Sequence, residues 1–393
     1  MIQYQLVLQR VLAEDTIQRI SGVCKLWVLL QTHSLWSPAQ AAYAEGFCRS
    51  ITWAAVVFEK RFAEAAVVYC LNLEDEEVDC MHNVEGKPIL VLGGTGHYGR
   101  HIVQSLLRKA APVRVLSRNA GNARKILGEV PEIVEGDITA KESVAEALNG
   151  VGAAIISVSA FAPKLIRKLK LIERDSVLAV LAEAERAGVS RIVYISTYGT
   201  SQDSPRGVNL ETTKIKSEVE NALARSDFNW TVLGAAPSMH IFFAMIRGDT
   251  MMVPGGGPPA LPTVSPVDVG EIAAQTVLRQ DLPRKRFRMV GPEAISFPEA
   301  AKRISSVAGR TIRFRKIPLV LPKMAYAVTR PLRPFSDVLL YVNQMLGFIK
   351  LLNQFPRDVI AEVPEVHRLL LDTFDYVPTT LEMEAQRWSK GLP

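Results

Sequence analysis

The spacing of apolar and polar positions changes near residue 86 and divides the chain into differently patterned parts. From there on, short apolar runs bounded by turn residues alternate with stretches whose apolar residues recur every three or four positions. Short continuous apolar runs are typical of strands buried on both faces, and the longer spacing is typical of amphipathic helices. Strands that alternate with helices predict βαβ units and a parallel sheet. The runs expected as strands are residues 88–92, 113–116, 132–134, 153–158, 191–196 and 230–233.

The regions on either side of this alternation differ from it in composition. The first 80 residues hold all four cysteines and three of the five tryptophans, but only two glycines and one proline. Beyond residue 236 proline becomes frequent, and from residue 318 the apolar spacing is mainly helical. We therefore expect three parts: an N-terminal extension over residues 1–84, a doubly wound Rossmann-type domain over 85–317 whose smaller substrate lobe is mainly 236–317, and a helical C-terminal extension over 318–393.

Charge and cysteine usage narrow the range of functions. A net charge of +6 over 393 residues does not call for a nucleic-acid partner. The cysteines match no zinc-binding spacing and the N-terminus lacks the features of a signal peptide, so we expect a cytoplasmic chain with reduced thiols. Met81 stands just before the first expected strand. This leaves open that translation starts there and that residues 1–80 do not belong to the natural protein.

A glycine-rich turn follows the first expected strand and opens the first expected helix. It reads Gly93, Gly94, Thr95, Gly96, His97, Tyr98 and Gly99, which satisfies both G-x-G-x-x-G and G-x-x-G-x-x-G. Glycines permit the tight turn and let backbone N–H groups approach a pyrophosphate, and the helix N-terminus adds partial positive charge. Because the motif stands between a strand and an amphipathic helix, it predicts a dinucleotide site.

The end of the second strand indicates which dinucleotide binds. An NAD-type site has an acidic residue there for the ribose 2′-hydroxyl, whereas this chain has Ser117, Arg118 and Asn119. An arginine suits a 2′-phosphate through a charge-assisted hydrogen bond. We therefore expect NADP(H) as the cofactor, with NAD(H) as the weaker ligand.

These motifs together resemble those of the NmrA-like and isoflavone-reductase-like group of atypical short-chain dehydrogenases/reductases. Further matches are Gly136 and Asp137 after the third strand, the run from Ala187 to Ser196, and Val267 to Val269 before a helix. The resemblance covers about residues 86–317 and implies the fold and the cofactor. It leaves the reaction open, because the group includes reductases, redox-sensing regulators and non-catalytic subunits. It further implies that Asp137 lies near the adenine and Ser157 near the nicotinamide ribose.

The same comparison shows a departure at the expected proton donor. Members of the wider superfamily pair a tyrosine with a lysine four residues later, which helps the tyrosine to donate a proton. Aligning Lys216 with that lysine puts Thr212 at the tyrosine position, and the alternative register through Lys214 puts Leu210 there. We expect Ser196, at the end of the fifth strand, to lie at the cofactor. Tyr198, two residues further, is the side chain that we predict as the proton donor, with Lys216 at the nicotinamide ribose.

Three other features each leave a structural and a functional interpretation open. His97 and His101 have helical i, i+4 spacing but no evident third ligand, so we expect no metal. Two basic runs, 164–174 and 310–316, are interpreted as exposed faces, although the first could lie near an anionic ligand. The apolar run 338–352 is too short to span a bilayer. It predicts core packing, with docking to a membrane surface or a partner as the alternative.

Two functions remain after these considerations. The first is an NADPH-dependent reductase of a small carbonyl, enone or quinone. The second is a non-catalytic subunit that binds NADP(H) and passes that state to a protein partner. The absent tyrosine favours the second, and the retained Lys216 with a full-length substrate lobe favours the first.

Overall fold

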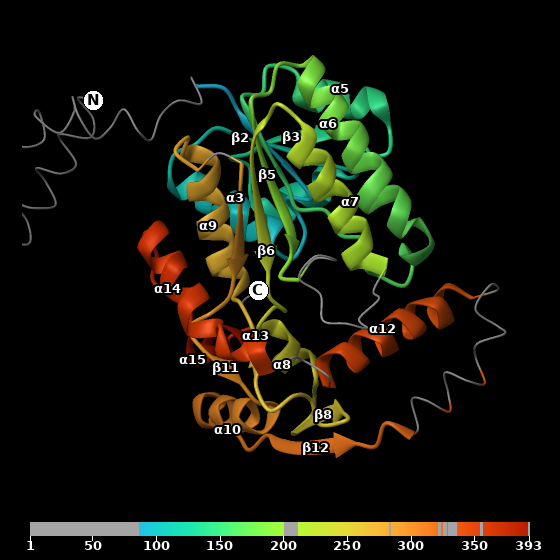
Figure 1. Cartoon of the computed structure of the whole chain (residues 1–393), viewed down its shortest axis with the longest axis vertical. Helices are drawn as coiled ribbons and strands as arrows, with labels where there is room; N and C mark the ends of the chain where they lie inside the picture. The colour runs from blue at the N-terminus through green and yellow to red at the C-terminus, as the bar shows by residue number, and fades with distance from the viewer. Residues whose placement is uncertain are drawn as a thin grey trace, which may run out of the picture. The chain divides into compact units, whose positions relative to one another are not determined.

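A seven-stranded sheet forms the centre of the computed structural model, which describes residues 86–199, 211–282, 284–320, 336–353 and 357–391 together with Met324 and Val328. Every neighbouring pair of strands in this sheet is parallel, and the strand order is β10-β6-β5-β4-β1-β2-β3 (Figure 1). The predicted doubly wound Rossmann-type fold is confirmed. Its strands are β1 (Ile89–Leu92), β2 (Val113–Ser117), β3 (Glu132–Glu135), β4 (Ala153–Ile156), β5 (Arg191–Thr197), β6 (Asn229–Ala235) and β10 (Lys285–Met289).

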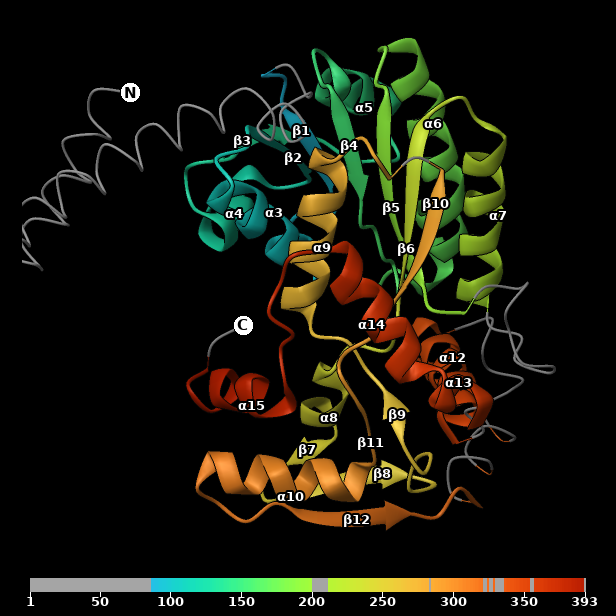
Figure 2. The same cartoon turned by 60° about the vertical axis from the view of Figure 1, so that its left-hand side comes forward.

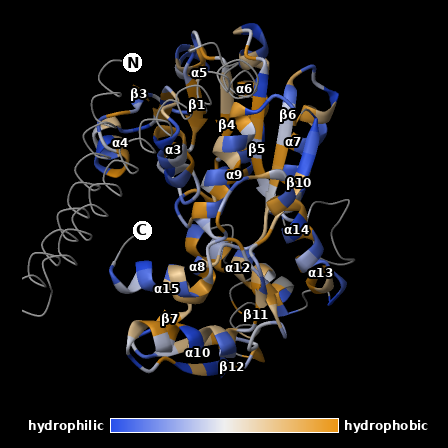
Figure 3. Ribbon diagram, turned by 90° about the vertical axis from the view of Figure 1, so that its left-hand side faces the viewer, coloured by the Kyte–Doolittle hydropathy of each residue, from blue (hydrophilic) through white to orange (hydrophobic). Residues whose placement is uncertain are grey.

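The seventh strand, β10, is absent from the sequence-based expectation. Lys285, Arg286 and Arg288 dominate it, and it is largely blue in the hydropathy colouring of Figure 3. It lies at the edge of the sheet, where only β6 pairs with it. Charged side chains at an edge strand oppose pairing with another chain. Such a strand therefore lacks the apolar run from which the other six could be predicted.

Helices cover both faces of the sheet, which explains why its strands are apolar throughout (Figure 2). One face carries α3 (Gly99–Arg108), α4 (Ala120–Leu127) and α9 (Pro266–Leu278), and the other carries α5 (Lys141–Leu148), α6 (Ser176–Arg186) and α7 (Glu211–Arg225). Helices α3 and α9 cross closely at Gly270. A Cβ at that position would lie 2.6 Å from the backbone carbon of His101.

A smaller lobe lies beyond the carboxyl ends of the strands (Figure 2). It contains a three-stranded sheet of β7 (Ile246–Arg247), β8 (Thr250–Pro254) and β12 (Arg313–Ile317), and a two-stranded sheet of β9 (Leu261–Pro262) and β11 (Ala294–Ile295). Helices α8 (His240–Ala244), α10 (Phe297–Ala308) and α15 (Leu381–Ser389) complete its apolar core with Phe242, Phe297 and Leu381.

The C-terminal region is helical in its described residues. Its elements are α12 (Asp337–Asn353), α13 (Arg357–Ala361), α14 (Val363–Thr373) and α15. Leu340 and Tyr341 of α12 pack against the cluster around Ile166, whereas Val338 remains 58% exposed. No helix in the described ranges is long and apolar enough to cross a membrane. The expectations for residues 1–84, including the start at Met81, concern residues outside those that the structure describes. The expected domain boundaries at residues 84 and 317 stay predictions.

Candidate functional site

The turn between β1 and α3 is shaped by its glycines. Gly93 has a φ of +81°, and a Cβ there would lie 2.3 Å from the carbonyl oxygen of Ser157. The N–H of Gly96 donates to the carbonyl of Gly93 at 2.9 Å and closes the turn. A Cβ at Gly99 would lie 2.0 Å from the same carbonyl oxygen, so only glycine lets α3 start directly against the turn. The turn therefore leaves backbone accessible beside the N-terminus of α3.

The first turn of α3 carries no acidic residue, so nothing there opposes an anion. Helix N-termini attract phosphate groups through their free N–H groups and the helix dipole. Gly94 has a packing role, because a Cβ there would lie 2.8 Å from the Val115 side chain. The geometry of the turn therefore fits the pyrophosphate of a dinucleotide, which is the cofactor class that the sequence predicts.

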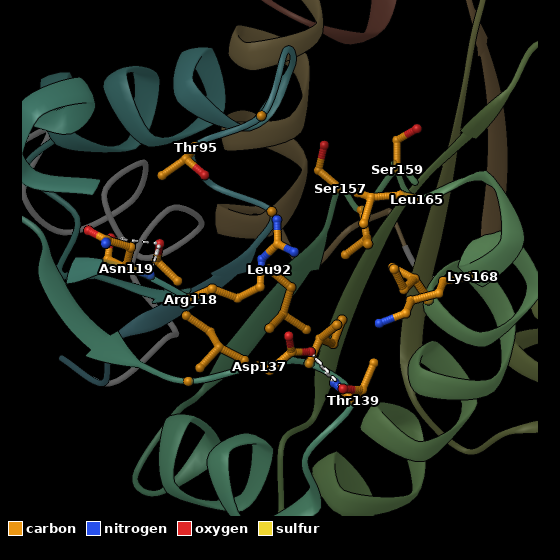
Figure 4. A pocket seen from close by; sticks show the side chains of 18 of the residues that line it. Leu92, Thr95, Arg118, Asn119, Asp137, Thr139, Ser157, Ser159, Leu165 and Lys168 are labelled. Atoms are coloured by element: carbon orange, nitrogen blue, oxygen red, sulfur yellow. Dashed lines mark hydrogen bonds between the residues drawn. The ribbon is translucent and has the colours of Figure 1, made fainter. Parts of the chain in front are cut away.

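A cavity of about 540 Å³ lies at the carboxyl ends of β1 to β4, over this turn (Figure 4). Eight residues predicted for the cofactor site line it: Gly93, Thr95, Gly96, His97, Tyr98, Arg118, Asp137 and Ser157. Five other predicted site residues are not among its lining, namely Gly94, Gly99, Ser196, Tyr198 and Lys216. A cavity of this size is in the range of small-molecule and cofactor sites.

One end of the cavity is formed by Asp137 and two cations. The N–H and hydroxyl of Thr139 both donate to Asp137 Oδ1, at 2.9 and 2.8 Å, and hold the carboxylate in place. Arg118 and Lys168 line the same end (Figure 4). Desolvation acts to raise the pKa of Asp137, but the Thr139 hydrogen bonds and the charges of Arg118 and Lys168 outweigh it and lower the pKa. Asp137 is therefore an anion that faces two cations.

The other end of the cavity is formed by Ser157, Val158 and Ser159 at the end of β4. Glu173 stabilises this segment, because its Oε1 accepts from the N–H of Ala160 at 2.6 Å and from the Ser159 hydroxyl at 3.2 Å. Only 1% of Glu173 is exposed. It lies in a short π-helix, η2 (Leu171–Asp175), and such irregular turns are frequent at functional sites.

Lys216 lies behind that segment and is buried. Its Nζ is 3.8 Å from Glu173 Oε2 and donates to the carbonyl of Ile195 at 3.3 Å, and it lies 5.1 Å from the centre of the Tyr194 ring. Burial acts to lower the pKa of Lys216, but Tyr194 and Glu173 outweigh it and raise the pKa. The ammonium is therefore charged and engaged by protein groups.

Ser196 and Tyr198 lie at the carboxyl end of β5, but their side chains contact other parts of the fold. Ser196 donates to Glu220 of α7, and Glu220 in turn accepts from Arg286 at 3.0 Å. Tyr198 is 7% exposed within the apolar cluster on the α9 side of the sheet, with its ring 5.4 Å from the Arg288 guanidinium. Their proposed roles at the cofactor and in proton donation stay predictions.

A polar cluster beside the cavity was not foreseen from the sequence. His97 Nε2 lies 2.7 Å from the Ser238 hydroxyl, and its ring lies 4.9 Å from that of His240. His240 Nε2 is 3.2 Å from Glu384, a side chain that is 3% exposed and that also accepts from Ser265. Desolvation, with His240 and Arg100, lowers the pKa of His97 to about 4. No local pattern could have linked these residues, since 144 positions separate His240 from Glu384.

Comparison with known proteins agrees with this geometry. Residues 93–277 match a family described as NAD(P)H-binding. The NAD(P)H azoreductase of Xenophilus azovorans is 26% identical over 242 residues, covering 60% of this chain and 79% of that protein. The photosystem II assembly factor Ycf39 of Trieres chinensis is 26% identical over 272 residues, covering 67% of this chain and 82% of that protein.

Solved structures share the fold. The triphenylmethane reductase of Citrobacter sp. superimposes with a TM-score of 0.59 at 18% identity, over 78% of this chain and 100% of that one. The same enzyme is also known in complex with NADP(H). At this identity the likeness concerns the fold alone.

Proposed function

We propose that this chain, whose residues 93–277 match a family described as NAD(P)H-binding, is an NmrA-like, atypical short-chain dehydrogenase/reductase that acts as an NADPH-dependent reductase of a small carbonyl, enone or quinone. The observation that carries this proposal is the cavity between the glycine turn and the Ser157–Ser159 segment. It lies at the carboxyl ends of the strands, where open α/β sheets bind their ligands. Relatives of this kind include an azoreductase.

The preference for NADP(H) rests on Arg118. It lines the cavity directly after β2, and no acidic residue of the described cavity wall stands at the end of that strand to repel a phosphate. A charge-assisted hydrogen bond contributes roughly 1.5–3 kcal/mol, which corresponds to about ten- to a hundredfold in affinity. Calorimetric titration should therefore give tighter binding of NADPH than of NADH, and Arg118→Ala should remove most of the difference. Equal affinities in the wild type would contradict this assignment.

In a reductase of this kind the reduced nicotinamide supplies the hydride, and the protein supplies position and a proton. Ser157 and Ser159 offer hydroxyl groups at the end of the cavity that we assign to the nicotinamide. Lys216 lies behind them, where its ammonium pairs with Glu173, and the other carboxylate oxygen of Glu173 accepts from the Ser159 hydroxyl. Tyr198 remains the proposed proton donor, on its position at the end of β5, and its burial in the apolar cluster requires a kinetic test.

The second candidate function is a non-catalytic NADP(H)-binding subunit. It is favoured by the engagement of Lys216 with Glu173 and Ile195, and by Thr212 at the position one turn earlier on α7. The Ycf39 relative is an assembly factor. NADPH oxidation measured against a panel of quinones, enones and azo dyes, beside a binding titration, separates the two. Turnover supports the reductase, and tight binding without turnover supports the subunit.

A further inference from the structure

The basic run over residues 164–174 is divided by the structure into residues with different partners. Arg167 pairs with Asp337 of α12, and Arg174 pairs with Asp175 and Glu218 at 2.7 and 2.8 Å. Among the basic residues of the run Lys168 alone lines the cavity, and within the described residues it forms no ion pair. The sequence could not separate these residues, because all of them belong to one short basic stretch.

Lys168 reaches the cavity from the side opposite to Arg118. Arg118 follows β2, whereas Lys168 closes the short 3₁₀ helix η1 (Ile166–Lys168) that follows β4, and β1 lies between those two strands. Figure 4 shows the Lys168 ammonium extending into the cavity, with Arg118 and Asp137 across from it. The charges of both Arg118 and Lys168 act on Asp137. Among the residues that line this end of the cavity, two cations therefore face a single carboxylate.

The segment that carries Lys168 also offers apolar surface to the same end. Leu171 and Ile172 line the cavity with Lys168, and Leu171 is 44% exposed although it is a large apolar side chain. An adenine ring has apolar faces that such side chains can cover, and the adjoining ribose carries the 2′-phosphate in NADP(H). A wall of apolar side chains with one lysine thus suits a phosphorylated adenosine.

The C-terminal extension holds this segment from behind. Leu340 and Tyr341 of α12 pack on the cluster that contains Ile166 and Leu169, and the rings of Phe161 and Tyr341 lie 5.4 Å apart. The Arg167–Asp337 ion pair joins η1 to the start of α12. Since Arg167 and Lys168 are neighbours, a change in how α12 holds η1 also moves Lys168.

We propose that Lys168 is a second ligand of the 2′-phosphate of NADP(H), that Leu171 flanks the adenine, and that α12 positions the segment that carries them. This inference rests on the proposed preference for NADP(H), and not on the proposed reductase activity. Lys168 is here a specificity-determining residue, and Asp337 a positioning residue that acts through η1.

The test compares ligands that differ only in the 2′-phosphate. Calorimetric titrations of the full chain with NADPH, NADH, 2′,5′-ADP and 5′-AMP give the affinities for wild type and Lys168→Ala. Because the lysine is exposed to solvent, we expect the lower part of the range for a charged contact, a loss of about five- to twentyfold for NADPH and 2′,5′-ADP. NADH and 5′-AMP should change less than about twofold. Lys170→Ala, an exposed lysine outside the cavity lining, is the matched control and should leave all four unchanged.

Two results would overturn the role of Lys168. Unchanged affinities for all four ligands in Lys168→Ala would show that Lys168 does not contact the bound nucleotide. Equal losses for NADPH and NADH would place it at the pyrophosphate instead. Neither result concerns turnover, so the reductase proposal is judged separately by NADPH oxidation. If the wild type itself does not prefer NADPH, the cofactor assignment and this inference both fail.

The proposed positioning of Lys168 by α12 is tested with a separate set of variants. Asp337→Asn should weaken NADPH by about two- to fivefold, in line with the small effect of an exposed ion pair, and leave NADH unchanged. The exchanged pair Arg167→Asp with Asp337→Arg should restore the NADPH affinity. If Asp337→Asn weakened the binding of NADPH and NADH equally, or changed neither affinity, α12 would not determine the position of Lys168.

Discussion

At the scale of single residues, the shape of the candidate cofactor site depends on two kinds of position. Some must be glycine because there is no room for a side chain, and others carry side chains that line the cavity. Gly93 and Gly99 approach backbone atoms so closely that a Cβ would overlap them. Arg118, Asp137 and Ser157 then line the cavity that lies over this turn. Glycine is therefore required here for close approach of backbone to backbone, which is a steric demand and not a matter of flexibility.

Gly99→Ala should damage both the fold and the site. The added Cβ would lie 2.0 Å from the Gly93 carbonyl oxygen, so the turn must shift. Overpacking of this kind costs typically about 1–3 kcal/mol, and we expect NADPH affinity to fall by more than about tenfold. Gly121→Ala is the control, because its nearest neighbour would be 3.6 Å away in α4. Urea unfolding and calorimetry should show the control to be as stable as the wild type and fully able to bind.

Tyr198→Phe tests the proposed proton donor. Loss of a general acid typically lowers the rate by about 10²–10⁴, so kcat should fall by that factor while the NADPH affinity stays unchanged. Thr212→Val should have little effect, and Lys216→Ala should weaken both binding and turnover because it leaves Glu173 buried without its ion pair. An unchanged kcat in Tyr198→Phe would instead point to a water or a substrate hydroxyl as the donor.

At the scale of elements, the crossing of α3 and α9 holds the cofactor turn against the sheet. His101 lies in this contact and is 5% exposed. Desolvation, followed by Arg100 and Arg387, lowers its pKa to about 3, so the folded chain keeps the imidazole neutral. The unfolded chain protonates the same group near pH 6.5. The contact therefore contributes a pH dependence to the stability of the whole cofactor domain.

His101→Gln should make the protein less sensitive to acid. The contribution of a neutral His101 is complete above pH 6.5 and is lost as pH falls toward 3, because only the unfolded chain binds the proton in that window. Each pH unit in the window is worth up to about 1.4 kcal/mol. Between pH 7 and pH 5 the wild type should thus lose about 2 kcal/mol more than the variant in urea unfolding. Parallel losses for the two proteins would exclude this role.

At the scale of the whole molecule, distant segments meet at two ends of one cavity. Helix α12 packs on the cluster around Ile166, close in sequence to Lys168, and Glu384 of α15 contacts His240, whose ring lies beside that of His97. The C-terminal extension thus contributes to a site whose lining residues all lie between Leu92 and Ile172. The described part of the chain beyond residue 330 supports the cofactor domain at both of these contacts.

A chain that begins at Met81 should fold and bind NADPH. The residues that line the cavity begin at Leu92, and the first strand starts at Ile89. We expect the shortened chain to keep the NADPH affinity of the full chain within about twofold, as measured by calorimetric titration. Failure to fold, or loss of nucleotide binding, would show that residues 1–80 are part of the cofactor domain.

The sequence by itself determined the fold class, the cofactor class and eight of the residues that line the cavity. Six strands were predictable because each is a short apolar run, and the glycine turn and Arg118 were predictable because their spacing from those strands is local. Such features are encoded within about 30 residues, where pattern and geometry coincide.

Only the tertiary structure decided what the remaining polar residues contact. It separated Lys168 from its basic neighbours, joined Lys216 to Glu173, and brought Glu384 to His240. It also buried Tyr198 on the α9 side of the sheet, where the sequence suggested an open strand end. The physical reason is that a buried charge requires a partner, and the chain supplies that partner from any element that folds nearby. Distance along the sequence carries no information about that choice.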